Sequence, residues 1–158
     1  MNYLAGFLLT RLLLPMLEHS APARVVNVAS AGQMPIDFDD VMLERDYTGV
    51  QAYCQSKLAQ VMFTFDLAAE LWDREVTANA LHPATFMPTK MVLAAGAEPV
   101  SSLEEGVEAT QRLVVGDEVE GMTDRYFNGV SEARAHPKAY DADARRRLRE
   151  LSEALVDN

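Results

Sequence analysis

The hydrophobic positions near the start of the chain follow two different periods. Residues 3–19 place leucine, phenylalanine and methionine side chains at spacings of three and four, which predicts a helix. Further leucines fill most of its other sides, so we expect this helix to be buried on more than one face. From Arg24 onward the pattern changes to a short β-branched run, Val25 to Ala29, which predicts an interior strand that ends at Ser30.

A long helix and a second strand follow. Residues 50–74 are rich in Ala, Leu, Gln and Met and contain no Gly or Pro, which favours one continuous helix. Residues 76–81 form the second strand, which Pro83 stops. The order strand, long helix, strand predicts a right-handed crossover and therefore a parallel sheet. We expect residues 33–49 to form a loop with one helical turn near 41–44.

The second half of the chain is more irregular. Residues 84–100 predict an apolar loop that is too long to be a simple connector. Ser101 and Ser102, followed by Glu104 and Glu105, are typical of a helix N-terminus and predict a helix over 103–115. A third short strand at 125–127 and an amphipathic helix at 141–156 complete a single α/β domain over residues 1–158.

Composition excludes several classes of function. A net charge of -10 disfavours nucleic acid and anionic membrane surfaces as partners. The single cysteine, Cys54, excludes an internal disulfide, and three scattered histidines give no metal-ligand spacing, so we expect no metal site and a cytoplasmic location. The opening MNYLAGFLLTRLLLPML is not typical of a signal peptide, because its first basic residue, Arg11, lies inside the apolar run. Its uninterrupted apolar stretch is also short of the ~20 residues that a membrane span needs.

Candidate chemistry lies where the two predicted strands end, because ligands of open parallel sheets bind beyond the carboxyl ends of the strands. The first strand ends at Ser30 and the second leads into His82 and Pro83. The helix between them carries a polar stripe at spacings of three and four, made of Tyr53, Ser56, Lys57, Gln60 and Thr64.

Tyr53 and Lys57 are neighbours one helical turn apart. A free phenol titrates near ~10, but an adjacent ammonium favours the phenolate and lowers that pKa. Tyr53 then becomes usable as a general acid or base, and the Ser30 hydroxyl could hold the substrate oxygen on which charge changes. The pattern Y-x-x-x-K alone occurs by chance in many helices. Its place between a strand ending in Ser and a strand ending in His-Pro favours a functional pair over a chance match.

Four motifs in fixed order, N-Y-L-A-G-F-L-L-T, R-V-V-N-V-A-S-A-G, Y-C-Q-S-K and N-A-L-H-P-A-T, resemble the short-chain dehydrogenase/reductases in their retinol-dehydrogenase-like branch. The resemblance implies an oxidoreductase that interconverts an alcohol and a carbonyl by hydride transfer with NAD or NADP. It implies a catalytic tetrad of Asn2, Ser30, Tyr53 and Lys57. In that tetrad Tyr53 exchanges the proton, Lys57 also binds the nicotinamide ribose, and Asn2 holds a water of the proton relay.

The same resemblance implies that Pro83, Phe86 and Thr89 face the nicotinamide carboxamide. The apolar, Met-rich loop over 86–99 suggests a small hydrophobic alcohol or carbonyl compound as substrate. Members of the family begin with a strand and a G-x-x-x-G-x-G turn, and the eight glycines of this chain form no such cluster. We therefore expect a partial Rossmann-type, doubly wound parallel sheet, with the last three strands, their flanking helices and only the nicotinamide half of the cofactor site.

Two functions remain open at this point. The chain is either the catalytic portion of a truncated oxidoreductase, its opening segment being an interior helix of the family, or an inactive fragment that serves only for association. The helices at 3–19 and 50–74 pack subunits together in this family, so self-association would use them. In both cases the strand over 25–29 should lie at an open, apolar edge of the sheet.

Overall fold

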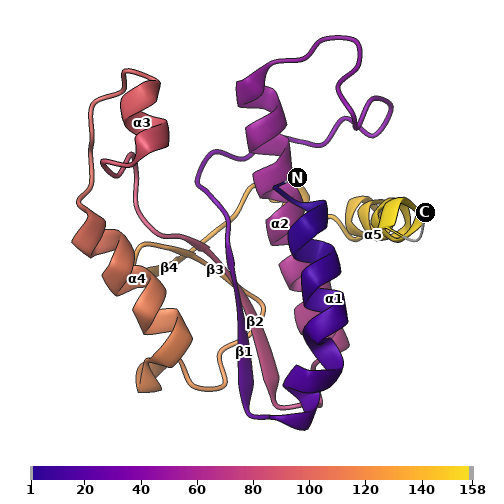
Figure 1. Ribbon diagram of the computed structural model, residues 1–158. Helices are drawn as coiled ribbons and strands as arrows, with labels where there is room; N and C mark the ends of the chain where they lie inside the picture. The colour runs from indigo at the N-terminus through magenta and orange to yellow at the C-terminus, as the bar shows by residue number, and fades with distance from the viewer. Residues whose placement is uncertain (1, 157–158) are drawn as a thin grey trace.

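The computed structural model describes residues 2–156. Its first half runs through α1 (Leu4–His19), β1 (Ala23–Val28), α2 (Gly49–Glu70) and β2 (Val76–His82). Its second half contains α3 (Lys90–Ala94), α4 (Leu103–Val115), β3 (Arg125–Asn128), β4 (Ser131–Ala133) and α5 (Ala142–Val156). Two single turns of 3-10 helix, Asp117–Val119 and Pro137–Tyr140, lie between these elements. Figure 1 shows their arrangement.

The strands form one sheet in the order β1-β2-β3-β4. The first three strands are parallel, and Val28 of β1 lies opposite Leu81 of β2, which lies opposite Phe127 of β3. Strand β4 pairs antiparallel with β3 through a tight turn in which Gly129 has φ 59. The prediction of three strands is therefore wrong by one, because three residues after a turn are too few to show a strand period.

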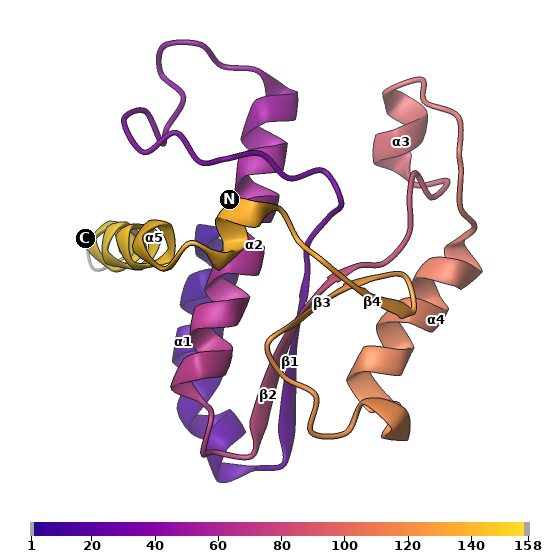
Figure 2. The same cartoon turned by 180° about the vertical axis from the view of Figure 1, so that it is seen from behind.

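Helices cover both faces of the sheet, which confirms the doubly wound α/β arrangement (Figures 1 and 2). On the α1 and α2 side, Val76, Ala78 and Ala80 of β2 pack against buried side chains of those helices. On the α4 side, Leu81 and Phe127 pack against the buried residues of α4. Strand β2 is buried along most of its length, because it lies between β1 and β3 and has helices on both faces.

Helix α1 is less buried than its composition predicts. Only Phe7 and Leu14 are buried in it, and Leu12 and Met16 are 70% and 59% exposed. Within residues 2–156, the expectation that this helix is buried on more than one face is therefore wrong. Its buried side packs on α2 and β1, where the Phe7 and Phe63 rings lie 4.9 Å apart, and the opposite side faces solvent.

Several predicted boundaries also differ. Helix α2 ends at Glu70 instead of residue 74, because the chain turns over residues 71–75, where Glu75 has φ 50. The helical turn expected at 41–44 is absent from the described chain. The Asp40 carboxylate instead accepts the main-chain N–H groups of Glu44 and Arg45 and holds a non-helical turn.

The predicted loop over 84–100 contains a helix of five residues, α3, which is too short to show a helical period. In contrast, α4 has the predicted bounds, because Ser102 and Glu105 form a capping box that fixes its start. Gly106 of α4 leaves room for the Met87 side chain of the loop.

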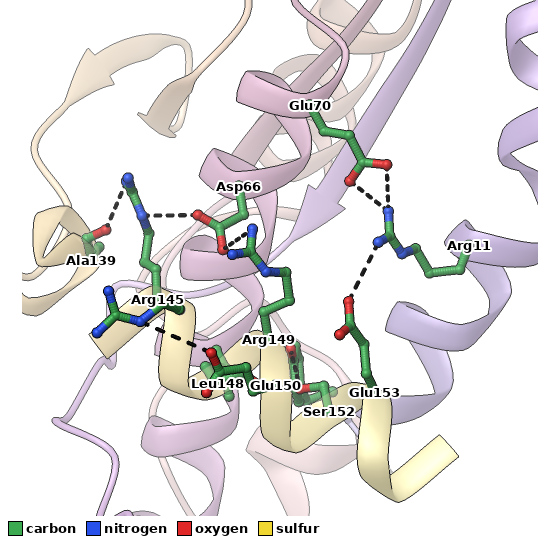
Figure 3. A network of polar contacts seen from close by, with 12 residues as sticks. Arg11, Asp66, Glu70, Ala139, Arg145, Leu148, Arg149, Glu150, Ser152 and Glu153 are labelled. Carbon is green, nitrogen blue, oxygen red and sulfur yellow. Dashed lines mark hydrogen bonds and ion pairs between the residues drawn. The ribbon is translucent and has the colours of Figure 1, made fainter. Parts of the chain in front are cut away.

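Helix α5 is joined to α1 and α2 by a polar network (Figure 3). Arg11 of α1 contacts Glu70 of α2 at 2.6 Å and Glu153 of α5 at 3.7 Å. Asp66 of α2 lies between Arg145 and Arg149 of α5, at 3.0 and 3.9 Å. Ser152 of α5 is buried, and its hydroxyl lies 2.8 Å from the Tyr3 hydroxyl. The last helix is thus fixed against the first.

Candidate active site

The carboxyl ends of β1 and β2 lie side by side, since the Ala29 N–H donates to the Leu81 carbonyl at 2.7 Å. The chain after β1 and the chain after β2 leave this edge on opposite sides, toward α2 and α3 respectively (Figures 1 and 2). The start of α1 reaches the same end of the molecule. Residues from three separate segments can therefore meet at this edge.

Ser30 is buried directly after β1 and is held through its backbone. Its carbonyl accepts hydrogen bonds from the Tyr126 hydroxyl at 3.1 Å and the Gln33 amide at 2.7 Å. The Gln33 side chain in turn accepts the His136 N–H at 2.9 Å, which ties this loop to the C-terminal part of the chain. The Ser30 hydroxyl accepts the Gly32 N–H at 3.1 Å.

Tyr53 and Ser30 border the same space. A methyl group built on Gly32 would lie 3.6 Å from the Ser30 hydroxyl oxygen and 3.7 Å from Cε1 of Tyr53, so both side chains reach one small volume. Tyr53 lies in the first turns of α2, whose start Thr48 caps by accepting the Gln51 N–H. The Lys57 Nζ lies 5.6 Å from the centre of the Tyr53 ring.

Lys57 makes two hydrogen bonds at this edge. Its Nζ donates to the Val28 carbonyl at 2.9 Å and to the Gln60 side-chain oxygen at 3.0 Å. The Val28 carbonyl points away from β2, because the next residue, Ala29, is the one that bonds to β2. Burial lowers the pKa of the Lys57 ammonium from its ordinary value. Two of its three N–H donors are used, and the third can meet another acceptor.

Asn2 lies just before α1 with an exposed side chain. Its main-chain carbonyl accepts a hydrogen bond from the Gln60 amide at 2.8 Å. Asn2 and Lys57 are thus connected through one intervening side chain. The sequence placed Gln60 on the polar stripe of this helix without giving it a role.

Pro83, Phe86 and Thr89 begin the segment that leaves β2. The Thr85 hydroxyl lies 3.0 Å from Nε2 of His82, and the Val100 N–H donates to the Phe86 carbonyl at 3.1 Å, which closes the segment into a loop. Phe86 is 54% exposed, and Thr89 precedes α3. Within residues 2–156 no hydrogen bond joins these three residues to Ser30, Tyr53 or Lys57. Their contacts with a cofactor stay predictions.

Comparison with known proteins identifies the family. The family model described as short chain dehydrogenase matches residues 1–99. The chain belongs to this family. It is 37% identical to human retinol dehydrogenase 14 over 169 residues, and the match covers 98% of this chain and 50% of that protein. Human retinol dehydrogenase 13 is 37% identical over 178 residues, with 98% and 52% covered.

A crystal structure of an uncharacterised protein from Mycobacterium paratuberculosis has the same fold, with a TM-score of 0.72 and 28% identity. That similarity covers 99% of this chain and 57% of the other. The resemblance drawn from the four motifs is confirmed. The chain spans about half the length of the curated relatives that it matches.

The family model ends before the C-terminal residues that support Ser30 and its loop. Tyr126 and His136, which contact Ser30 and Gln33, lie beyond residue 99. Sequence patterns gave no signal for this support, because the contacts join distant segments. Among residues 2–156 no group of three or more His, Cys, Asp or Glu side chains is arranged to hold a metal ion. No helix in this described range is long and apolar enough to cross a bilayer.

Proposed function

We propose that this chain carries the catalytic half of an oxidoreductase that interconverts an alcohol and a carbonyl compound with NAD or NADP. One observation supports it most: the Ser30 hydroxyl and the Tyr53 ring border one space at the sheet edge, and the Lys57 ammonium lies beside that ring. Membership of the short chain dehydrogenase family agrees with this chemistry.

Each side chain then has a role that follows from its chemistry. Tyr53 gives a proton to the carbonyl oxygen in reduction and takes one from the alcohol in oxidation. The positive charge of Lys57 stabilises negative charge that develops on the phenol oxygen. The Ser30 hydroxyl donates to the substrate oxygen and orients it. The nicotinamide, when bound, supplies or accepts the hydride.

The residues present suit the nicotinamide half of such a cofactor. Lys57 retains one N–H donor for a ribose hydroxyl, and Pro83, Phe86 and Thr89 follow β2 at the same sheet edge as Ser30. The eight glycines of the chain give no glycine-rich turn for a pyrophosphate. We therefore include in the proposal a further segment that supplies this turn and covers the free edge of β1 and the exposed side of α1.

The proposed substrate is a small hydrophobic alcohol or carbonyl compound. The loop beyond β2 presents Phe86, Met91 and Leu93, which are 54%, 65% and 58% exposed. Apolar side chains at the end of the sheet favour a ligand that can bury apolar surface there.

Hydride transfer between nicotinamide and a panel of hydrophobic alcohols and aldehydes tests the proposal, with this chain extended by the upstream coding sequence. Tyr53→Phe should lower kcat by about 10²-fold or more, because the phenyl ring cannot exchange a proton. Tyr47→Phe is the matched control, since Tyr47 is 69% exposed and lies before α2. Full activity of a folded Tyr53→Phe protein would contradict the proposal.

We expect the 158-residue chain to bind NADH and NADPH very weakly, because its eight glycines form no glycine-rich turn for the pyrophosphate. Isothermal titration calorimetry measures this directly. A dissociation constant in the micromolar range would show that the proposal of a half site is wrong.

A second function, association without catalysis, is favoured by the exposed apolar side of α1, where Leu9, Leu12 and Met16 are 58%, 70% and 59% exposed. In that case a second copy of the chain packs against α1 and α2. Sedimentation should then show a concentration-dependent dimer that Leu12→Glu abolishes. A monomer at all concentrations would exclude this function.

A further inference from the structure

The Gln60 side chain forms a direct link between Lys57 and the backbone of Asn2. Its oxygen accepts from the Lys57 Nζ at 3.0 Å, and its nitrogen donates to the Asn2 carbonyl at 2.8 Å. The two bonds determine which end of the amide is which, because an ammonium only donates and a carbonyl only accepts. A side-chain amide carries an acceptor oxygen and a donor nitrogen, so Gln60 makes both bonds at once.

This link joins segments that are distant in sequence, since Gln60 and Asn2 are separated by 58 residues. Gln60 lies on the same side of α2 as Lys57 and Thr64, and the Thr64 hydroxyl accepts from Asn27 of β1. This side of α2 therefore faces both β1 and the start of α1. Gln60 is the residue through which the start of α1 touches the lysine.

We propose that Gln60 is a positioning residue for Lys57. The Gln60 side-chain oxygen and the Val28 carbonyl hold two N–H groups of the Lys57 ammonium, so that the third N–H points in a fixed direction. The inference rests on the proposed function only for the consequence of this orientation. The link itself is a property of the folded chain and can be measured without a cofactor.

Among the described residues, one ionisable group, the Tyr53 phenol, faces Lys57, and the other groups are neutral amides and carbonyls. From α2 Lys57 meets the Tyr53 ring and the Gln60 amide, from β1 the Val28 carbonyl, and from the start of α1 only the Asn2 carbonyl through Gln60. Burial is the cause that lowers its pKa, and within residues 2–156 it forms no ion pair with a carboxylate. The loss of one hydrogen-bond acceptor should therefore change its pKa visibly.

The experiment is a pH titration of the full chain labelled with ¹³C at the lysine ε-carbons, followed by NMR. The chain has three lysines, Lys57, Lys90 and Lys138, so three signals are expected and Lys57→Arg assigns the relevant one. Gln60→Leu should lower the pKa of Lys57 by about half to one pH unit, because the ammonium loses an acceptor. Gln60→Glu should raise it, because a carboxylate replaces the amide oxygen.

Gln51→Leu is the matched control, with the same chemical change in the first turn of α2, where only the main chain of Gln51 bonds to Thr48. It should leave the Lys57 signal unchanged, and the Lys90 and Lys138 signals should not move in any variant. A purely structural role of Gln60 would change stability but not the Lys57 titration. An unchanged Lys57 pKa in both Gln60 variants would overturn the proposal, and Gln60→Glu decides alone if Gln60→Leu does not fold.

Failure of the proposed function gives a different result. If Gln60 substitutions shift the Lys57 titration but Tyr53→Phe leaves hydride transfer unchanged, the link exists and the catalytic assignment is wrong. If Tyr53→Phe abolishes activity but the Lys57 titration is insensitive to Gln60, the catalytic assignment holds and the positioning role is wrong.

Discussion

The Tyr126 hydroxyl donates to the main-chain carbonyl of Ser30 at 3.1 Å. Tyr126→Phe removes this bond and leaves the ring in place, so we expect the free energy of unfolding to fall by about 1 kcal/mol. Urea denaturation measures the change. Tyr47→Phe, at an exposed site, should have no effect. Equal stability of the Tyr126→Phe and wild-type chains would show that the Gln33 bond alone holds Ser30.

Two of the five tyrosines should resist ionisation in the folded chain. Burial raises the pKa of Tyr3 and of Tyr126 to about 12. The unfolded chain ionises these phenols near 10, so it loses protons first and the free energy of unfolding should fall as the pH rises from about 10 to 12. Ultraviolet titration of the phenolates measures this, and the late phase should be lost in a Tyr3→Phe, Tyr126→Phe double variant.

His82 should remain neutral to lower pH than a free histidine. Burial of its ring at the end of β2 lowers its pKa, and its Nε2 lies 3.0 Å from the Thr85 hydroxyl. The unfolded chain takes up the proton first, so this residue should reduce stability as the pH falls below about 6.5. NMR of the three histidine rings measures the pKa, and His82→Gln identifies the signal. A titration of His82 at or above the ordinary value would contradict the burial argument.

Asp66 should depend on the two arginines of α5 that contact it. Burial raises the pKa of this carboxyl, and Arg145 and Arg149 oppose that change. Replacing both arginines by Met should raise the pKa of Asp66 further and lower the free energy of unfolding near pH 7 by about 1 to 2 kcal/mol. Protonated Asp66 does not need the arginines, so the loss should shrink as the pH falls through the raised pKa.

Denaturation at several pH values checks the Asp66 prediction. Arg146→Met on the same helix is the control, because its side chain is 60% exposed and contacts only residues of α5. When both chains carry Asp66→Asn, the difference in free energy of unfolding between the chain with both arginines and the chain with both methionines should not depend on pH. If the loss of stability caused by the two Met substitutions is the same at every pH in the chain that keeps Asp66, the loss comes from packing and not from charge.

The parts of the fold that depend on local signals could be predicted from the sequence. Ser102 and Glu105 form a capping box, so the start of α4 follows from this local signal. The contact of Tyr53 with Lys57 follows from their spacing on one helix. The exposed side of α1 could not be predicted, because an apolar pattern states which residues need a neighbour and not which neighbours are present.

The support around the site was also beyond sequence patterns. Gln60 reaches Asn2 only because α1 packs beside α2, and Tyr126 reaches Ser30 only because β3 lies next to β2. Such contacts depend on how separate elements are arranged, and periodicity within one element carries no information about them. Gln60 could have been suspected only as a polar residue on the stripe that also carries Lys57.

The bond between Tyr3 and Ser152 connects residues 149 positions apart, and the one between Tyr126 and Ser30 spans 96. During translation, therefore, the segment around Ser30 cannot form its bond to Tyr126 until β3 has emerged from the ribosome. By then Tyr53 and Lys57 have long been synthesised. A premature stop codon before Ser152 would leave Tyr53 and Lys57 intact and remove the Tyr3–Ser152 bond, and α1 would keep its contacts with α2 and β1. The last helix to be synthesised thus completes the contacts of the first one.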